Sequence, residues 1–252
     1  VYQDLSLCTN VDVVANFFMG RELTRSILGI PVLDESAMEA QVAEAMSAAG
    51  TKIPSLRTKV EHLSGGQRQA IELNRFVHWG GKLGRLDAPF AALGVEQTRR
   101  GLEMIRHVAS QGIGVVIITH IMQQAFQVAD RIVVMYLGQI MEQGTTEQIF
   151  APPYHPYTEA LLSAVPIADT HIKKRKVLIS GDLPSPSNPP KGCPFCTRCP
   201  YVIEGLCETR KAPVRRMASG HAIACHLDEM TLNDMEPVIK MADEGEGEPA
   251  HA

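Results

Sequence analysis

One stretch of this sequence decides its fold: Leu63-Ser64-Gly65-Gly66-Gln67-Arg68-Gln69. A serine followed by two glycines predicts the start of a helix, which we expect to run to about His78. At such a start the first backbone N–H groups have no acceptor within the helix, and the positive end of the helix dipole lies beside them. The stretch therefore predicts a helix whose N-terminus suits a phosphate group.

Helical and strand patterns follow one another on both sides of this stretch. Residues 35–49 predict an amphipathic helix that starts with a capping box, Ser36 and Glu39. Residues 96–111 predict a second helix, and the apolar run 115–118 predicts a buried parallel strand. A helix followed by a buried strand is typical of α/β folds. Further strands are expected at 131–137 and 139–143, and a short helix at 157–164.

The composition changes in the last third of the chain. Residues 180–190 contain four prolines and predict a linker or extended segment. Five of the six cysteines lie between Cys193 and Cys225, and such crowding in a reducing compartment indicates metal ligation more than disulfides. The acidic stretch from Asp228 onward is expected to be largely disordered.

Charge and hydropathy exclude two functional classes. The formal charge of -4 gives no electrostatic footprint for nucleic acid, and the one basic cluster, 173–176, is too short to provide one. No run approaches the roughly 18 apolar residues of a transmembrane helix, and no secretory signal is present, so we expect a cytoplasmic protein. The chain starts at Val1 in mid-pattern, which we interpret as a truncated N-terminus.

The stretch at 63–69 resembles the signature motif of the ATP-binding cassette (ABC) family, and neighbouring motifs occur in family order. Residues 2–5 resemble the Q-loop, Leu86-Asp87 the end of the Walker B strand, 91–94 the D-loop, and Thr119-His120 the H-loop. The resemblance implies a partial P-loop NTPase fold and ATP with Mg²⁺ as cofactors. It also implies a head-to-tail dimer with a second ABC ATP-binding subunit.

The resemblance also implies a role for individual residues. Gln3 would lie near the metal and the coupling surface, Asp87 would contact Mg²⁺, and His120 would contact the γ-phosphate. The residues expected to contact the nucleotide of the partner subunit are Ser64, Gly65, Gly66 and Gln67.

Two features depart from the family pattern. No Gly-x-x-x-x-Gly-Lys-Ser/Thr occurs, and the nearest look-alike, Gly80-Gly81-Lys82, lacks the first glycine and the hydroxyl. In the Walker B region Arg85 interrupts the apolar run, and Ala88 stands where the family has the glutamate that activates water. We therefore expect impaired hydrolysis by this chain alone and an accessory role beside a P-loop-bearing subunit.

The chain resembles two types of importer. Sequence stretches before Asp130 resemble carbohydrate-importer cassettes. Stretches from Val133 onward, such as His155-Pro156-Tyr157-Thr158, resemble oligopeptide and dipeptide importer cassettes. We favour peptide uptake through transmembrane permease subunits, at the cytoplasmic face of the membrane. The alternatives are a carbohydrate importer subunit and a metal-binding remnant without nucleotide function.

The cysteine module resembles the C-terminal extension of peptide-importer cassettes. Cys193, Cys199, Cys207 and Cys225 fall where that family carries cysteines, and the resemblance favours a [4Fe-4S] cluster, with Zn²⁺ as the alternative. Cys196 is a fifth candidate, His221 or His226 could replace a thiolate in a zinc site, and packed free thiols remain a further alternative. Cys8 is expected to be a small buried hydrophobe.

The predicted fold is thus α/β: a partial ABC cassette with a small cysteine-rich C-terminal extension. We divide the chain into a partial nucleotide-binding domain at 1–150, the extension at 151–227, and a disordered acidic tail at 228–252.

Overall fold

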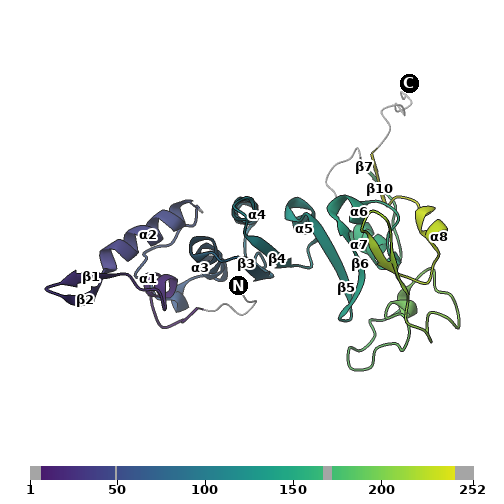
Figure 1. Ribbon diagram of the computed structural model, residues 1–252, viewed down its shortest axis with the longest axis horizontal. Helices are drawn as coiled ribbons and strands as arrows, with labels where there is room; N and C mark the ends of the chain where they lie inside the picture. Colours follow the sequence, from purple (N-terminus) through teal and green to yellow (C-terminus); the bar gives the residue numbers. More distant parts are fainter. Residues whose placement is uncertain (1–6, 49, 167–171, 242–252) are drawn as a thin grey trace, which may run out of the picture. The chain divides into compact units, whose positions relative to one another are not determined.

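The computed structural model describes residues 7–48, 50–166 and 172–241. The chain divides into two compact units, Val1–Val128 and Ala129–Ala252 (Figure 1). The division falls just before β5 (Arg131–Tyr136), not after residue 150 as predicted. The reason is that the strands that follow residue 130 pair with strands of the C-terminal extension.

The first unit is mixed α/β, which confirms the predicted class. Its elements are α1 (Val13–Phe18), β1 (Thr24–Ile27), β2 (Ile30–Leu33), α2 (Glu35–Ala48), a 3-10 turn (Val60–His62), α3 (Gly65–Trp79), β3 (Leu83–Asp87), α4 (Val95–Ser110), β4 (Gly114–Ile118) and α5 (Met122–Val128).

Helix α2 has the predicted apolar stripe but a different cap. Met38, Val42 and Met46 are buried in a cluster with residues of α1. Residue 49, the last of the predicted helix, lies outside the described residues. The Asp34 carboxylate accepts a hydrogen bond from the Ala37 N–H (3.1 Å), so the predicted cap at Ser36 is wrong.

Strands β3 and β4 form a parallel pair, with Leu83 opposite Gly114 and Asp87 opposite Ile118. Leu86 is fully buried against side chains of α3 and α4, in a cluster that includes Leu73, Leu102 and Ile105. Gly84 lies so close to α3 that a Cβ atom there would be 2.1 Å from the ring of Phe76. The glycine in this strand therefore allows close packing of the signature helix.

The second unit is built on a four-stranded antiparallel sheet in the order β5-β6-β9-β8. Its remaining elements are β6 (Gln139–Thr145), α6 (Thr146–Phe150), α7 (Pro156–Ala164), β7 (Ile172–Lys174), a 3-10 turn (Cys196–Arg198), β8 (Val214–Arg216), β9 (Ala222–Ala224), α8 (Glu229–Asn233) and β10 (Ile239–Met241).

A buried acid joins three segments of the second unit. Glu142 on β6 is fully buried, and one of its oxygens lies 2.7 Å from Nε2 of His221. Its other oxygen accepts a hydrogen bond from the backbone N–H of His155 (2.8 Å). The two histidines are themselves buried, so strand β6, the turn before β9 and the start of α7 depend on one carboxylate.

The chain between Asp228 and Met241 is ordered, in contrast to the predicted disordered tail. Helix α8 buries Leu232, and β10 pairs with β7 in antiparallel fashion. Val238 is also buried, and its N–H donates to the hydroxyl of Tyr154 (2.9 Å). These apolar contacts come from residues far apart in the sequence, so local composition did not reveal them. The remainder of the predicted tail, 242–252, lies outside the described residues.

Candidate nucleotide-contacting site

The signature stretch forms the N-terminus of α3, as predicted. Ser64 is the N-cap: its Oγ accepts from the Gln67 N–H (3.2 Å), and the Ser64 N–H donates to Oε1 of Gln67 (3.0 Å). The N–H groups of Gly65 and Gly66 occupy the first two helical positions, which have no intrahelical acceptor. Gly65 is exposed and Gly66 is half-buried, so this end can approach an external anion.

Gln69 ties the signature helix to the loop that follows β3. Its side chain is buried, its Nε2 donates to the Ala88 carbonyl (2.8 Å), and its Oε1 accepts from the Ala92 N–H (2.8 Å). No role was expected of Gln69 from the sequence. Its position next to the apolar residues Ala70 and Ile71 could have indicated a buried amide, and a buried amide needs hydrogen-bond partners.

Asp87 and His120 lie at the carboxyl ends of neighbouring parallel strands. Asp87 is the last residue of β3, and His120 comes two residues after the end of β4. The Ala88 N–H donates to the carbonyl of Ile118 (2.9 Å), which links the two strand ends. Asp87 is half-buried and His120 is exposed. The carboxyl edge of a parallel sheet is where α/β proteins bind ligands.

Ala88 follows Asp87 directly after the end of β3. Its backbone adopts a positive φ of 42°, a conformation that is uncommon for residues other than glycine. The Gln69 and Ile118 hydrogen bonds hold it there. Its methyl side chain provides no acid or base at the position after Asp87.

The described residues among the predicted nucleotide contacts all lie in the first unit, where the Gln69 side chain and one backbone hydrogen bond connect their segments. The signature helix connects through the Gln69 side chain to Ala88, which follows Asp87. Ala88 in turn bonds to Ile118, two residues before His120. Gln3 lies outside the described residues.

Gly66 is required by the close approach of the D-loop. A Cβ atom at Gly66 would lie 2.8 Å from the Ala92 carbonyl oxygen, whereas a Cβ at Gly65 would lie 3.6 Å from the Ala92 side chain.

We expect Gly66→Ala to lower the free energy of unfolding of the first unit by about 1–3 kcal/mol. Gly65→Ala is the matched control and should be near neutral. Urea unfolding followed by fluorescence of Trp79, the only tryptophan, measures both, and equal midpoints for the two variants would contradict the prediction.

The predicted metal-ligating cysteines are packed in an apolar core. Cys193, Cys207 and Cys196 are buried with Phe195, and Cys199 is partly buried against them. The Cys193 N–H donates to the Cys207 carbonyl (2.8 Å). Burial, reinforced by the neighbouring thiols, raises the pKa of Cys193 to about 11 and that of Cys199 to about 12.

This core does not support the predicted metal centre. Within 7–48, 50–166 and 172–241, no three His, Cys, Asp or Glu side chains are placed so that they could hold a metal ion. The spacing of Cys193, Cys199, Cys207 and Cys225 predicted such a group, but these side chains are buried or partly buried in the second unit, where they pack as small hydrophobic residues do. Cys8, expected to be buried, is exposed.

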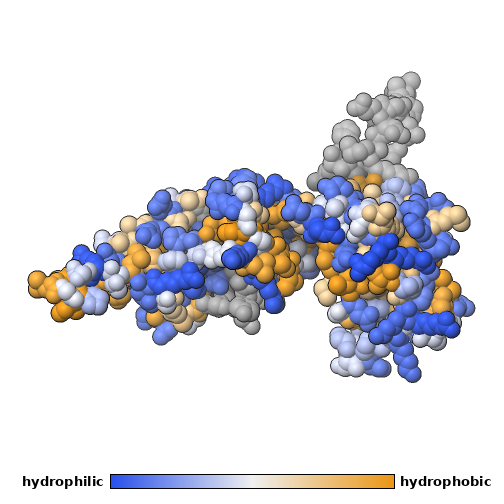
Figure 2. Space-filling model, viewed as in Figure 1, coloured by the Kyte–Doolittle hydropathy of each residue, from blue (hydrophilic) through white to orange (hydrophobic). Residues whose placement is uncertain are grey.

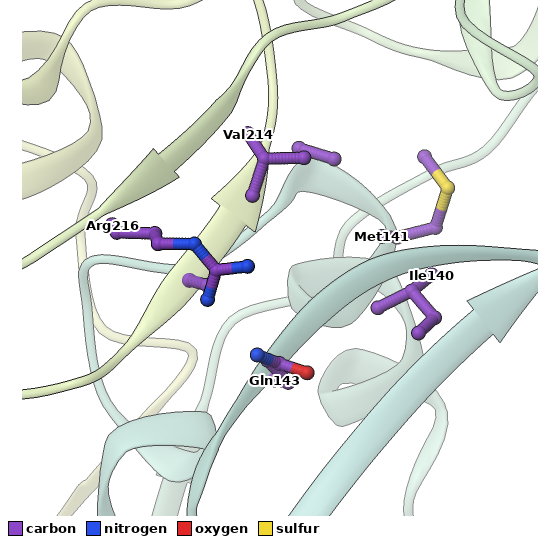
Figure 3. Close-up of a pocket in the computed structure, with 7 residues that line it drawn as sticks. Ile140, Met141, Gln143, Val214 and Arg216 are labelled. Carbon is purple, nitrogen blue, oxygen red and sulfur yellow. The ribbon is translucent and has the colours of Figure 1, made fainter.

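A small hollow on the four-stranded sheet is a second candidate site (Figure 3). It has a volume of about 120 Å³ and lies where alanines on β9 sit between larger side chains of β6 and β8. Pockets for drug-sized ligands are usually about 300 Å³ or larger, so this hollow is too small for a nucleotide. Its lining residues are Ile140, Met141, Gln143, Val214, Arg216, Ala222 and Ala224.

Comparisons with known proteins identify relatives of both units. Residues 141–207 match the family described as oligopeptide/dipeptide transporter, C-terminal region. The dipeptide transport ATP-binding protein DppF of Haemophilus influenzae is 35% identical over 215 residues, a match that covers 82% of this chain and 65% of that protein. The oligopeptide transport ATP-binding protein OppF of Salmonella typhimurium is 38% identical over 177 residues, with 69% and 52% coverage. This chain therefore spans roughly half to two thirds of these relatives.

Among solved structures, the dimeric ATP-binding cassette MJ0796 bound to ADP and Pi matches with a TM-score of 0.49 and 19% identity. The match covers 58% of this chain and 61% of that chain. No helix in the described part of the chain is long and apolar enough to cross a membrane.

Proposed function

Because this chain is a member of the ABC transporter ATP-binding subunits, of the peptide-importer type, we propose that its signature helix completes a nucleotide site on a second subunit. That second subunit would supply the P-loop, which this sequence lacks, and the carboxylate that activates water. The chain would thus act as the accessory half of a head-to-tail pair.

The observation that carries this proposal is the geometry at the start of α3. Ser64 and Gln67 satisfy each other's backbone groups, so the first turn is held in place without a ligand. The N–H groups of Gly65 and Gly66 then remain for an external acceptor, with the helix dipole behind them. The γ-phosphate of ATP, bound to Mg²⁺ on the partner, has the charge and oxygen acceptors that this end favours.

Turnover by this chain alone is not part of the proposal. No P-loop can cradle the β- and γ-phosphates, and Ala88 cannot accept a proton from water. Asp87 would contribute one carboxylate to Mg²⁺, and His120 would contact the γ-phosphate, only where another chain holds the nucleotide. The proposal includes no iron–sulfur or zinc centre, because the cysteine side chains do not fit one.

The transported substrate is proposed from the relatives. DppF and OppF are named as dipeptide and oligopeptide transport proteins, and the DppF match is long enough to include the signature helix as well as the C-terminal half. This favours peptides over carbohydrates for the whole chain. The partners would be permease subunits in the membrane, with this chain at the cytoplasmic face.

The test measures ATP turnover by the purified chain, by a P-loop-bearing peptide-importer cassette, and by their mixture. We expect no turnover by this chain alone and a changed rate in the mixture. Ser64→Asp should abolish that change, because aspartate caps the helix as well as serine does but repels the phosphate. Ser110→Ala, at the exposed end of α4, is the control and should behave as wild type. No change in the mixture, or an unaltered effect of Ser64→Asp, would refute the composite site.

A further inference from the structure

The loop between β3 and α4 lies directly against the start of the signature helix. The Ala92 carbonyl oxygen is so close to Gly66 that a Cβ atom there would meet it at 2.8 Å, and a Cβ at Gly65 would meet the Ala92 side chain at 3.6 Å. The backbone at Ala92 therefore supports the turn whose two N–H groups would face a phosphate. A shift of this loop would change the position of that turn.

Apolar packing alone does not fix where this loop lies along α3. The loop leads into α4, whose outer surface is hydrophilic (Figure 2). The inner residues Leu102 and Ile105 of α4 pack with Leu73 of α3. Contacts between aliphatic side chains are non-directional, so they hold two helices together but allow small displacements along each other. Hydrogen bonds depend on distance and angle, so they define a position more narrowly.

The side chain of Gln69 supplies two such hydrogen bonds from α3. Its Nε2 donates to the Ala88 carbonyl and its Oε1 accepts from the Ala92 N–H, both at 2.8 Å. Gln69 is buried, so its amide cannot exchange these partners for bulk water. Ala88 has a positive φ, a conformation that persists only where neighbouring contacts hold it. One side chain of α3 thus holds the loop at two points.

We infer that Gln69 is a positioning residue for the composite nucleotide site. It fixes the signature turn relative to the loop 88–94, so that the N–H groups of Gly65 and Gly66 and the carboxylate of Asp87 are held as one set. The inference rests on the proposed function and adds a residue that does not itself contact the nucleotide. Its loss should lower the maximal rate more than the affinity for ATP, because the P-loop of the other subunit would supply most of the binding contacts.

The first measurement uses the full chain alone and follows hydrogen exchange of residues 88–94. Methionine has nearly the length of glutamine but no amide, so Gln69→Met should speed exchange of the Ala92 N–H at least about tenfold. Asn74→Leu is the matched control. Asn74 is a buried amide of the same helix, but its Nδ2 donates to the Ala70 carbonyl of the preceding turn (2.7 Å), so this change should leave the loop as in wild type. Equal exchange in wild type and Gln69→Met would overturn the inference.

The second measurement is ATP turnover in the mixture with a P-loop-bearing cassette. Gln69→Met should reduce the change in maximal rate at least about tenfold and leave the half-saturating ATP concentration within about twofold. Asn74→Leu should keep the wild-type effect, although it also removes a buried amide from α3, which separates positioning from a general loss of stability. Gln69→Asn keeps the amide but is one methylene too short to reach both backbone groups. It should act in the same direction and serves if Gln69→Met does not fold.

The two measurements distinguish failure of this inference from failure of the composite site. A wild-type effect on turnover that Gln69→Met keeps in full would overturn the positioning role and leave the composite site intact. No effect of the wild-type chain would refute the composite site itself, and this inference with it.

Discussion

Replacing Glu142 with alanine is expected to destabilise the second unit by about 3–5 kcal/mol. The change removes a buried carboxylate and leaves its two buried partners, on His221 and His155, without their hydrogen-bond acceptor. Nε2 of His221 and the N–H of His155 both lie within 2.8 Å of this carboxylate. Four tyrosines lie in the second unit and Trp79 lies in the first. Urea unfolding followed by near-ultraviolet circular dichroism of the tyrosines therefore measures the loss in the second unit, while Trp79 fluorescence should be unchanged.

A second variant distinguishes loss of the Glu142–His221 interaction from a nonspecific loss of stability. His221→Ala should cost a similar amount, and the double variant should cost clearly less than the sum, because both changes break the same interaction. Glu204→Ala, an exposed glutamate of the same unit, should change the unfolding free energy by less than about 0.5 kcal/mol. Strict additivity of Glu142→Ala and His221→Ala would show that the pair is not coupled.

The stability of the second unit should fall steeply in acid because of His155. Burial lowers the pKa of His155 to about 3, from an ordinary value of 6.5, while its Nδ1 accepts a hydrogen bond from the Tyr157 N–H (3.0 Å). Between these two pH values the unfolded chain binds a proton that the folded chain does not. The contribution is therefore complete above pH 6.5 and is lost as the pH falls toward 3, by roughly 5 kcal/mol in total.

The test compares how steeply the unfolding free energy changes with pH in two proteins. The unfolding free energy of wild type and of His155→Gln is measured by urea titration at several pH values from 7 to 4. Burial raises the pKa of Glu142, which has the opposite sign and makes stability fall as pH rises, but the difference between the two proteins isolates His155. His107→Gln, at an exposed histidine of α4, should keep the wild-type slope. An unchanged slope in His155→Gln would contradict the assignment.

Local sequence was enough to predict the helices and strands that flank the signature. Helices α2, α3, α4 and α7 and strands β4, β5 and β6 lie within a few residues of their predicted positions. These elements depend on the period of apolar residues and on turn and cap residues a few positions away, so the information is contiguous in the chain. The signature cap at Ser64 is local in the same way, since its partner Gln67 is three residues away.

The sequence by itself therefore determined the family and the secondary structure near the signature, and it showed that position 88 carries no acid. Only the tertiary structure decided what joins these elements: Gln69 reaches a loop 19 and 23 residues away, and Glu142 pairs with a histidine 79 residues away. It also decided that the cysteines pack in an apolar core, and that the residues the structure describes form no metal-holding group. These outcomes depend on which side chains meet after the chain has folded, and neither spacing nor composition specifies a contact between residues that are distant in sequence.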